Sequence, residues 1–253
     1  MTFLHIAIFA LVEGVTEFLP VSSTGHLILT AQLLHLPQTE VQKTFEIAIQ
    51  MGAILAVAVL YGRTLLMEKR TMLLVGAAFV PTAVIGFLLH GVVKSLLGNT
   101  DVVLLALFLG GIVLLVFERF TPTGRAQSIR EMTVTQAFLI GICQSVALVP
   151  GVSRSAATIV GGEFLGVSRK TAVEFSFLLA IPTMAAATGY DVLKSAGEFT
   201  SADVLSLAIG FVLSFLVALA AVKWFVGYIQ RNSFAAFGVY RIVIALAFFL
   251  FLR

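Results

Sequence analysis

Two apolar segments of the chain, residues 3–35 and 134–166, are each interrupted near the middle by a proline followed by small polar residues. The interruptions read Leu-Pro-Val-Ser-Ser-Thr-Gly at 19–25 and Val-Pro-Gly-Val-Ser-Arg-Ser at 149–155. A helix needs about 20 residues to cross the ~30 Å apolar core of a bilayer, so each segment is too long for one crossing and too short for two. Broken backbone at that depth is tolerated only where protein buries it or where it lines a wet cavity. The pattern therefore predicts two re-entrant helical hairpins.

The composition places the rest of the chain in a membrane as well. Of the 253 residues, 59% are hydrophobic and 11% are charged, whereas about 25% are charged in an ordinary soluble domain. This excludes a soluble globular protein and a disordered one. We expect an all-α polytopic membrane protein, one integral membrane domain over residues 1–253, with six transmembrane helices besides the two hairpins. The six predicted spans are residues 45–62, 71–93, 102–118, 172–190, 203–226 and 236–252.

The two halves of the chain resemble each other. A shift of 130 residues places Pro20 on Pro150, Ser23 on Ser153 and Gly111 on Arg241, and a shift of 128 places Phe45-Glu46 on Val173-Glu174. Each half, about 1–120 and 134–253, contains one broken hairpin and three full spans. Because an odd number of spans inverts the second half, the sequence predicts an inverted-topology repeat.

The Lys and Arg residues in the short connections are distributed unevenly, which predicts the orientation. One side would carry Arg63, Lys69, Arg70, Arg119, Arg125, Arg130, Arg169, Lys170 and Arg231, and the other only Lys43, Lys94, Lys194 and Arg253. Because cytoplasmic loops carry the excess of positive charge, the first set is expected in the cytoplasm and both termini outside. The first hairpin then enters from outside and the second from the cytoplasm, so that their tips meet near the midplane.

The first break is surrounded by ionisable and hydroxyl side chains. Glu13 and Glu17 are four positions apart and share one helix face, where they need a divalent cation, a shared proton or an arginine between them. A structural pair bonded to the backbone is the alternative. Ser22, Ser23 and Thr24 are suited to capping the next half-helix. His26 follows Ser23 by one turn, so its imidazole and the Ser23 hydroxyl are predicted to reach one ligand.

The second break supplies Ser153, Arg154, Ser155 and Thr158 at the start of another half-helix. A guanidinium forks onto two oxygens of a tetrahedral oxyanion, and free N–H groups at a helix N-terminus favour negative charge. Two such helix starts facing each other predict a phosphate site, although Arg154 could also neutralise Glu13 or Glu17. Glu46, Gln50 and Glu174 are interpreted as polar contacts that hold the tips. Arg241 is expected to be a structural partner for one of these glutamates.

Residues 13–26, Glu-Gly-Val-Thr-Glu-Phe-Leu-Pro-Val-Ser-Ser-Thr-Gly-His, closely resemble the first signature of the bacterial undecaprenyl-diphosphate phosphatases, the bacitracin-resistance family. Residues 150–158, Pro-Gly-Val-Ser-Arg-Ser-Ala-Ala-Thr, resemble the second signature, and residues 174–182 also fit. The resemblance runs from the first helix to the last. One departure is Ala156, because the family usually has glycine after Ser-Arg-Ser.

The resemblance implies a phosphatase of the bacterial inner membrane that converts undecaprenyl diphosphate to the monophosphate carrier of cell-wall synthesis. It implies a divalent cation, Mg²⁺ or Ca²⁺, an active site open to the outer face, and roles for Glu13, Glu17, Ser23, His26 and Arg154. Glu13 and Glu17 are the expected metal ligands, since hard cations prefer oxygen. The expected substrate-binding residues are Ser22, Thr24, Gln50, Ser153, Ser155 and Thr158.

The mechanism and the wider class remain open from the sequence. Ser23, His26 or an activated water could attack the terminal phosphorus. The expected partners are a polyprenyl diphosphate lipid and membrane lipid, with a homodimer left open and no nucleic acid. A transporter or flippase for a phosphate-bearing lipid is the alternative, because broken helices that meet at the midplane are also a transporter layout. A carrier needs the anion site but no nucleophile and base, so Glu17, Ser23 and His26 favour the enzyme.

Overall fold

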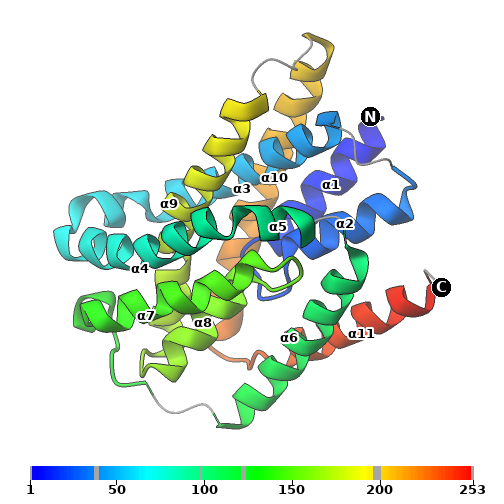
Figure 1. Ribbon diagram of the computed structural model, residues 1–253. Helices are drawn as coiled ribbons and strands as arrows, with labels where there is room; N and C mark the ends of the chain where they lie inside the picture. Colours follow the sequence, from blue (N-terminus) through cyan, green and yellow to red (C-terminus); the bar gives the residue numbers. More distant parts are fainter. Residues whose placement is uncertain (1, 37–39, 97–98, 121–123, 196–200, 252–253) are drawn as a thin grey trace.

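The structure, a computed structural model, describes residues 2–36, 40–96, 99–120, 124–195 and 201–251 (Figure 1). Regular structure in these ranges is helical, apart from one isolated bridge between Ala126 and Val167. The first half contains α1 (Phe3–Thr16), α2 (Ser23–Leu33), α3 (Glu40–Met67), α4 (Lys69–Leu88), α5 (His90–Leu96) and α6 (Thr100–Phe120). The second half contains α7 (Val134–Ser145), α8 (Arg154–Phe164), α9 (Arg169–Ser195), α10 (Ser201–Ile229) and α11 (Ala235–Phe251), with the short 3₁₀ turns η1 (Ile129–Glu131) and η2 (Val146–Leu148).

Five helices in the described ranges, α3, α4, α6, α9 and α10, are long and apolar enough to cross a membrane. They coincide with five of the six predicted spans, which confirms a polytopic helical membrane protein. The sixth prediction coincides with α11, which is apolar but has 17 residues. The predicted span 71–93 ends early, because α4 stops at Leu88 after 20 residues and α5 begins at His90. Twenty residues of helix already cover about 30 Å.

Both apolar segments with a central proline are broken where the sequence predicts. α1 ends at Thr16 and α2 begins at Ser23, and Ser22 is the N-cap of α2. In the second segment α7 ends at Ser145, and α8 begins at Arg154 with Ser153 as its N-cap. A cap side chain accepts a hydrogen bond from one of the first helical N–H groups, which would otherwise lack a partner inside the protein. Each break therefore ends in a serine that starts the next half-helix.

The helices pack in a reciprocal arrangement. α1 packs against α10, and α7 packs against α4, while α3 contacts α9 and α6 contacts α11. Two glycines allow very close approach: a Cβ atom on Gly52 would lie 2.3 Å from the Phe211 oxygen, and one on Gly141 would lie 2.0 Å from the Ala78 oxygen. Small residues are the usual means by which membrane helices pack closely. Each broken segment is thus held by a helix from the other half of the chain.

The two ends of the chain lie on the same side of the molecule, and the turn between α3 and α4 lies on the opposite side (Figure 1). Residues predicted to be cytoplasmic form ion pairs between neighbouring connections. Arg130 contacts Glu68 at 2.8 Å, and Arg169 contacts Glu118 at 2.9 Å and Glu163 at 3.2 Å. The pairs of Arg130 with Glu68 and of Arg169 with Glu118 tie together connections that are distant in sequence. Of the residues predicted on the other side, the side chains of Lys43, Lys94 and Lys194 and the whole of Arg253 lie outside the described part of the chain.

Candidate functional site

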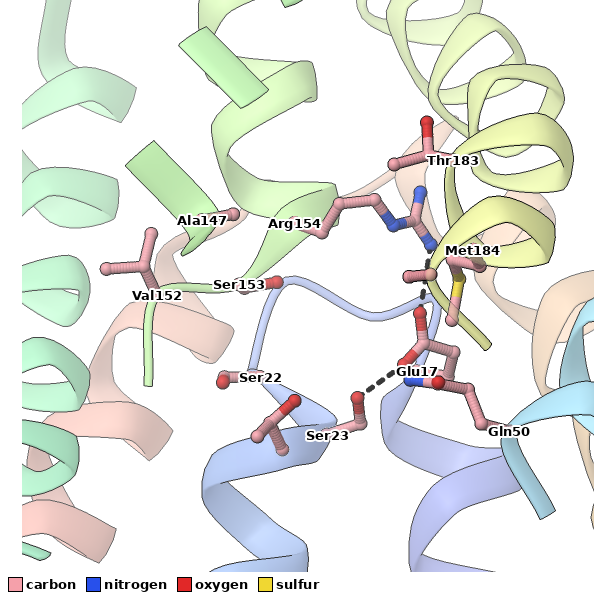
Figure 2. Close-up of a pocket in the computed structure, with 12 residues that line it drawn as sticks. Glu17, Ser22, Ser23, Gln50, Ala147, Val152, Ser153, Arg154, Thr183 and Met184 are labelled. Carbon is pink, nitrogen blue, oxygen red and sulfur yellow. Dashed lines mark hydrogen bonds and ion pairs between the residues drawn. The ribbon is translucent and has the colours of Figure 1, made fainter. Parts of the chain in front are cut away.

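A cavity of about 130 Å³ lies between the two breaks (Figure 2). Both half-helix starts reach it, together with the middle of α3 and of α9. The lining residues are Glu17, Ser22, Ser23, Thr24, Gln50, Ala147, Val152, Ser153, Arg154, Thr183, Met184 and Ala187. Eight of these carry groups that can bond a phosphate oxygen or move a proton, and the other four are small or apolar. The cavity therefore joins the tips of the two segments, as the sequence predicts.

The first break presents its hydroxyl groups from a constrained backbone. Ser22 has φ +72°, in the left-handed region that residues other than glycine seldom adopt. Its side chain accepts a hydrogen bond from the Gly25 N–H at 3.4 Å, which caps α2. Backbone strain of this kind costs about 1–3 kcal/mol and persists only where the surroundings enforce it. The turn at Ser22 allows Ser22, Ser23 and Thr24 all to line the cavity.

Ser23, Glu17 and Arg154 form a connected chain across the cavity (Figure 2). The Ser23 hydroxyl donates a short hydrogen bond to Oε2 of Glu17. Oε1 of Glu17 accepts from Nη2 of Arg154 at 3.2 Å, and both side chains are largely buried. A hydroxyl bonded to a carboxylate that a third group orients is the arrangement of an activated nucleophile. The sequence predicted that the tips carrying these residues meet and that Arg154 could neutralise Glu13 or Glu17; in the structure the partner of Arg154 is Glu17.

Arg154 is fixed from the far side, yet one of its donors is unused. Nη1 donates to the Ser176 carbonyl oxygen at 3.0 Å, and the guanidinium lies 5.5 Å from the centre of the Phe18 ring. Nε is buried and has no hydrogen-bond partner. A buried donor without a partner is costly, so it indicates a position where a ligand oxygen completes the bonding. Arg154 is therefore held ready for an anion.

His26 lies outside the cavity lining, although the sequence predicted that it would share a ligand with Ser23. Its Nε2 is 2.8 Å from the Tyr240 hydroxyl of α11, and its Nδ1 is 2.7 Å from the Ser22 carbonyl oxygen. The two rings stack with an interplanar angle of 6°. These bonds assign Nδ1 as the donor to Ser22 and Nε2 as the acceptor from Tyr240. In this structure both ring nitrogens of His26 are already used.

Two of the predicted substrate-binding hydroxyls bond to protein rather than to the cavity. Ser155 is fully buried and donates to the Leu19 carbonyl oxygen at 2.7 Å, and Ser153 donates to the same oxygen at 3.3 Å. Thr158 is buried and donates to the Ser176 hydroxyl at 2.7 Å. Of these three residues, only Ser153 lines the cavity. Ser153 and Ser155 thus hold the second break against the first.

The carboxylates of Glu13 and Glu17 are suited to a divalent cation whose coordination is completed by phosphate oxygens of a bound substrate. Within the residues the structure describes, no group of three His, Cys, Asp or Glu side chains gathers as a complete metal site. Glu13 is completely buried, and neither of its carboxylate oxygens has a hydrogen-bond partner. Mg²⁺ commonly takes only one or two protein carboxylates and completes its shell with phosphate oxygens and water. Glu13, one turn before Glu17, has oxygens without a partner that suit this role, although its side chain lies behind the cavity lining.

The expectation that Arg241 pairs with a glutamate is wrong. Its guanidinium donates to the backbone carbonyl oxygens of Pro20, Ala106, Leu107 and Gly151. Carbonyl oxygens that a break frees from helical bonding need such a donor. Glu46 accepts from Gln42 at 3.0 Å on its own helix, and Glu174 lies 3.9 Å from Lys170.

Several residues at the site were not singled out from the sequence. Thr183, Met184 and Ala187 of α9 line the cavity, and Ser176 of the same helix holds Arg154 and Thr158. The sequence signal that could have found the α9 residues was Pro182, because a proline inside an apolar span leaves a backbone carbonyl without its helical partner. Tyr240 gave a weaker one, because a tyrosine hydroxyl within an apolar helix requires a partner.

Comparisons with known proteins agree with the resemblance read from the two breaks. The family model described as bacitracin resistance protein BacA matches residues 6–247. A protein of Aquifex aeolicus named undecaprenyl-diphosphatase is 50% identical over 99% of this chain and 100% of its own length. Proteins of the same name from Thermus thermophilus and Wolinella succinogenes are 48% and 46% identical. They cover 96% and 100% of this chain, and 95% and 99% of their own lengths.

Proposed function

This chain belongs to the family of bacitracin resistance protein BacA, and from that premise we propose that its cavity is the active site of an undecaprenyl-diphosphate phosphatase. The reaction removes the terminal phosphate of undecaprenyl diphosphate and returns the monophosphate lipid that carries cell-wall precursors. The observation that carries the proposal is the chain of bonds from Ser23 through Glu17 to Arg154 at the junction of two helix starts. A nucleophile, a base and an anion-binding group there are what phosphoryl transfer needs.

The two broken segments act as re-entrant hairpins in an inverted-topology repeat, which together with α11 gives six transmembrane helices. The reciprocal packing supports this, since α1 lies on α10 and α7 lies on α4. Two repeats of opposite topology bring their broken helices to the midplane, where the half-helix starts point at a shared ligand. A single integral membrane domain of two halves, about 1–120 and 134–253, follows.

The protein lies in the bacterial inner membrane, with the cavity open to the periplasmic or extracellular face and both termini outside. The excess of Lys and Arg on the connections at the other end supports this orientation. The positions of the two chain ends on one side of the molecule agree with it (Figure 1). A homodimer stays a prediction, and light scattering of the detergent-solubilised protein measures it.

In the first chemical step, Ser23 Oγ attacks the terminal phosphorus while Glu17 takes the hydroxyl proton. The bond from that phosphorus to the bridging oxygen breaks, and undecaprenyl phosphate leaves with the electron pair. Glu17 gives that proton to the departing undecaprenyl phosphate and is again a carboxylate. A water then attacks the phosphoserine and passes a proton to Glu17, which returns it to Ser23 Oγ as the phosphorus–Oγ bond breaks and inorganic phosphate is released. The hydrogen bond from Ser23 to Glu17 supports this assignment over attack by His26, whose nitrogens are bonded elsewhere. Direct attack by water remains the other route.

The phosphoryl group is held by charge and by hydrogen bonds. Arg154 Nε and the N–H groups of the two helix starts face the oxygens that gain negative charge in the transition state. Ser22, Thr24, Gln50 and Ser153 line the same cavity and complete the binding of the diphosphate. Ser155 and Thr158 serve the site indirectly, through Leu19 and Ser176. Glu13 and Glu17 would hold Mg²⁺ or Ca²⁺, which supplies charge neutralisation for the diphosphate.

The test is phosphate release from undecaprenyl diphosphate by the purified protein in detergent. We expect Ser23→Ala and Glu17→Gln to abolish turnover, whereas Ser95→Ala, an exposed serine of α5, serves as the matched control and leaves it unchanged. EDTA is expected to stop release, and added Mg²⁺ or Ca²⁺ to restore it. Acid-stable, alkali-labile labelling from substrate bearing radioactive terminal phosphate would identify phosphoserine, whereas an acid-labile label would identify His26.

The transporter or flippase alternative is not favoured, because the matching relatives carry the name of a phosphatase. Folded protein that binds the lipid and releases no phosphate would contradict the enzyme and support that alternative.

A further inference from the structure

Arg241 of α11 is fully buried and is bonded entirely to backbone carbonyl oxygens. Nη1 donates to Pro20 at 3.2 Å and Nη2 donates to Gly151 at 3.0 Å, so that one guanidinium joins the two breaks. Nη2 and Nε donate to Ala106 and Leu107 of α6 at 3.0 and 3.3 Å. No described carboxylate lies within ion-pair distance of this group. All of its hydrogen bonds therefore hold backbone atoms in place, and none neutralises a carboxylate.

The two carbonyls at the breaks need this donor because helix geometry does not supply one. Pro20 and Gly151 lie between half-helices, where the regular N–H to carbonyl ladder is interrupted. In an apolar environment an unsatisfied backbone group is strongly unfavourable. A planar guanidinium with five donors can satisfy carbonyls from different directions, which the ammonium of lysine does less well. Fixing both oxygens to one rigid plane also fixes the separation of the two tips.

Two glycines of α6, Gly110 and Gly111, make room for the Arg241 side chain. A Cβ atom on Gly110 would lie 2.1 Å from Nη2 of Arg241. Gly111 occupies the position in the first half that corresponds to Arg241 in the second, and a Cβ atom there would lie 3.2 Å from the Arg241 Cβ. Equivalent positions of the two halves thus face each other, and only one of them can carry a large side chain. A single arginine serves both breaks.

We propose that Arg241 is a positioning residue of the phosphatase: by holding Pro20 and Gly151 it sets the distance between Ser23 on α2 and Arg154 on α8. The inference rests on the proposed function, because Ser23 and Arg154 act on the same phosphoryl group. A displacement of about 1 Å between reacting groups can cost about 100-fold in rate. The role concerns geometry, so its loss is expected in kcat more than in KM.

The experiment uses two variants that disturb the contact from opposite sides. Arg241→Lys keeps the charge and loses the fork. Gly110→Ala keeps the arginine and places a methyl group against Nη2. Gly76→Ala is the matched control, because a Cβ atom there has no neighbour within 4 Å. The kcat and KM for undecaprenyl diphosphate are measured per folded enzyme, with the thermal midpoint in detergent as the check of folding.

We expect Arg241→Lys and Gly110→Ala each to lower kcat about 10-fold or more, with KM changed less than about 3-fold, and Gly76→Ala to match the wild type. In the double variant, Gly110→Ala should lower kcat by less than about 3-fold relative to Arg241→Lys alone, because the guanidinium that the methyl group displaces is already absent. If Arg241→Lys does not fold, Gly110→Ala tests the proposal in a chain that retains the arginine.

Two results would overturn the positioning role. One is a kcat of Gly110→Ala within about 2-fold of the wild type, and the other is effects of the two substitutions that multiply independently. A wild-type protein that releases no phosphate would instead refute the proposed function, so that the two failures are distinguishable.

Discussion

Arg154 illustrates how much of the site depends on the shape of a single side chain. Nη2 contacts Glu17, Nη1 contacts the Ser176 carbonyl oxygen, and Nε is left for a ligand. Three directions are therefore used by one planar group. A residue with the same charge and a different shape could satisfy only one of them at a time.

Replacing Arg154 by lysine is therefore expected to lower kcat/KM by about 100-fold or more, since an ammonium cannot pair with Glu17 and bind a phosphoryl oxygen together. The measurement is steady-state phosphate release in detergent. Arg231→Lys, at an exposed arginine outside the cavity, is the control. Near-normal turnover by folded Arg154→Lys protein would refute the role assigned to Arg154.

The residue types at the site could be predicted from the sequence, but the orientations of some side chains could not. Glu17, Ser23 and Arg154 stand beside the two prolines, so the breaks alone bring them to one cavity. His26 was expected beside Ser23 because three positions along a helix bring side chains to similar faces. Its direction depends on Tyr240, which is 214 positions away in sequence and comes from another helix. No local pattern contains that information.

At the scale of elements, the contact between the two breaks determines how the half-helices face each other. Ser155 and Ser153 both donate to the Leu19 carbonyl oxygen, and Ser155 makes the shorter bond. The second segment therefore supplies hydrogen bonds that the first lacks. This contact and the one from Arg241 hold neighbouring carbonyl oxygens of the same break, those of Leu19 and Pro20.

Ser155→Ala is expected to destabilise the protein by about 1 kcal/mol, because it removes a buried hydrogen bond and leaves Leu19 with the longer bond from Ser153. The measurement is the free energy of unfolding in mixed detergent micelles. The exposed-serine variant Ser95→Ala should be unchanged. Equal unfolding free energies for Ser155→Ala and the wild type would show that the contact carries no net stability.

A second prediction for elements concerns the turn between α3 and α4, where Glu68 bonds to Arg130 of η1. The hydrogen bond from Arg130, with a further one from Thr71, holds the pKa of the Glu68 carboxyl below its ordinary value. Because the folded pKa is the lower one, the stabilisation is present above the unfolded pKa and is lost as the pH falls through the folded pKa. We expect the thermal midpoint of unfolding to decrease when the pH is lowered below about 4.

The control for this pH effect is Glu68→Gln, which should have a shallower fall of the midpoint in acid than the wild type. Arg130→Gln should behave in the same way, because it removes the same pair from the other side. An unchanged acid slope in both variants would contradict the linkage. The side chain of Arg130 is exposed and that of Glu68 is partly exposed, so the effect is expected to be small.

The elements themselves were largely predictable. A run of apolar residues about 20 long fixes a span by length alone, and proline fixes where a longer run is broken. The interruption between α4 and α5 was missed, because the one proline in residues 71–93, Pro81, lies inside α4 without ending it, and only His90 and Gly91 stand at the actual break. The partners of each helix were also beyond prediction. Gly52 and Gly141 permit close packing, but nothing in their neighbourhoods identifies Phe211 or Ala78 as the contact.

For the whole molecule, the proposed orientation makes opposite connections accessible from opposite faces. With Cys143 replaced by alanine, Ser95→Cys should react in intact cells with a maleimide that cannot cross the membrane. Gln127→Cys, beyond the other end of α6, should react only after the cells are permeabilised. Both positions are exposed. If Gln127→Cys reacted in intact cells and Ser95→Cys did not, the proposed orientation would be wrong and the cavity would open to the cytoplasm.

The bonds from α11 to the first break also have a consequence for synthesis. Tyr240 and Arg241 complete the hydrogen bonding of His26 and Pro20, residues that leave the ribosome more than 200 positions earlier. Until α11 is made, the first half contains its serines and glutamates without the donors that arrange them. Contacts so distant in sequence form late, because a long loop must close before they are gained. Catalytic competence is therefore acquired at the end of translation, and a nascent chain that has not reached Arg241 carries the reactive residues without the enzyme.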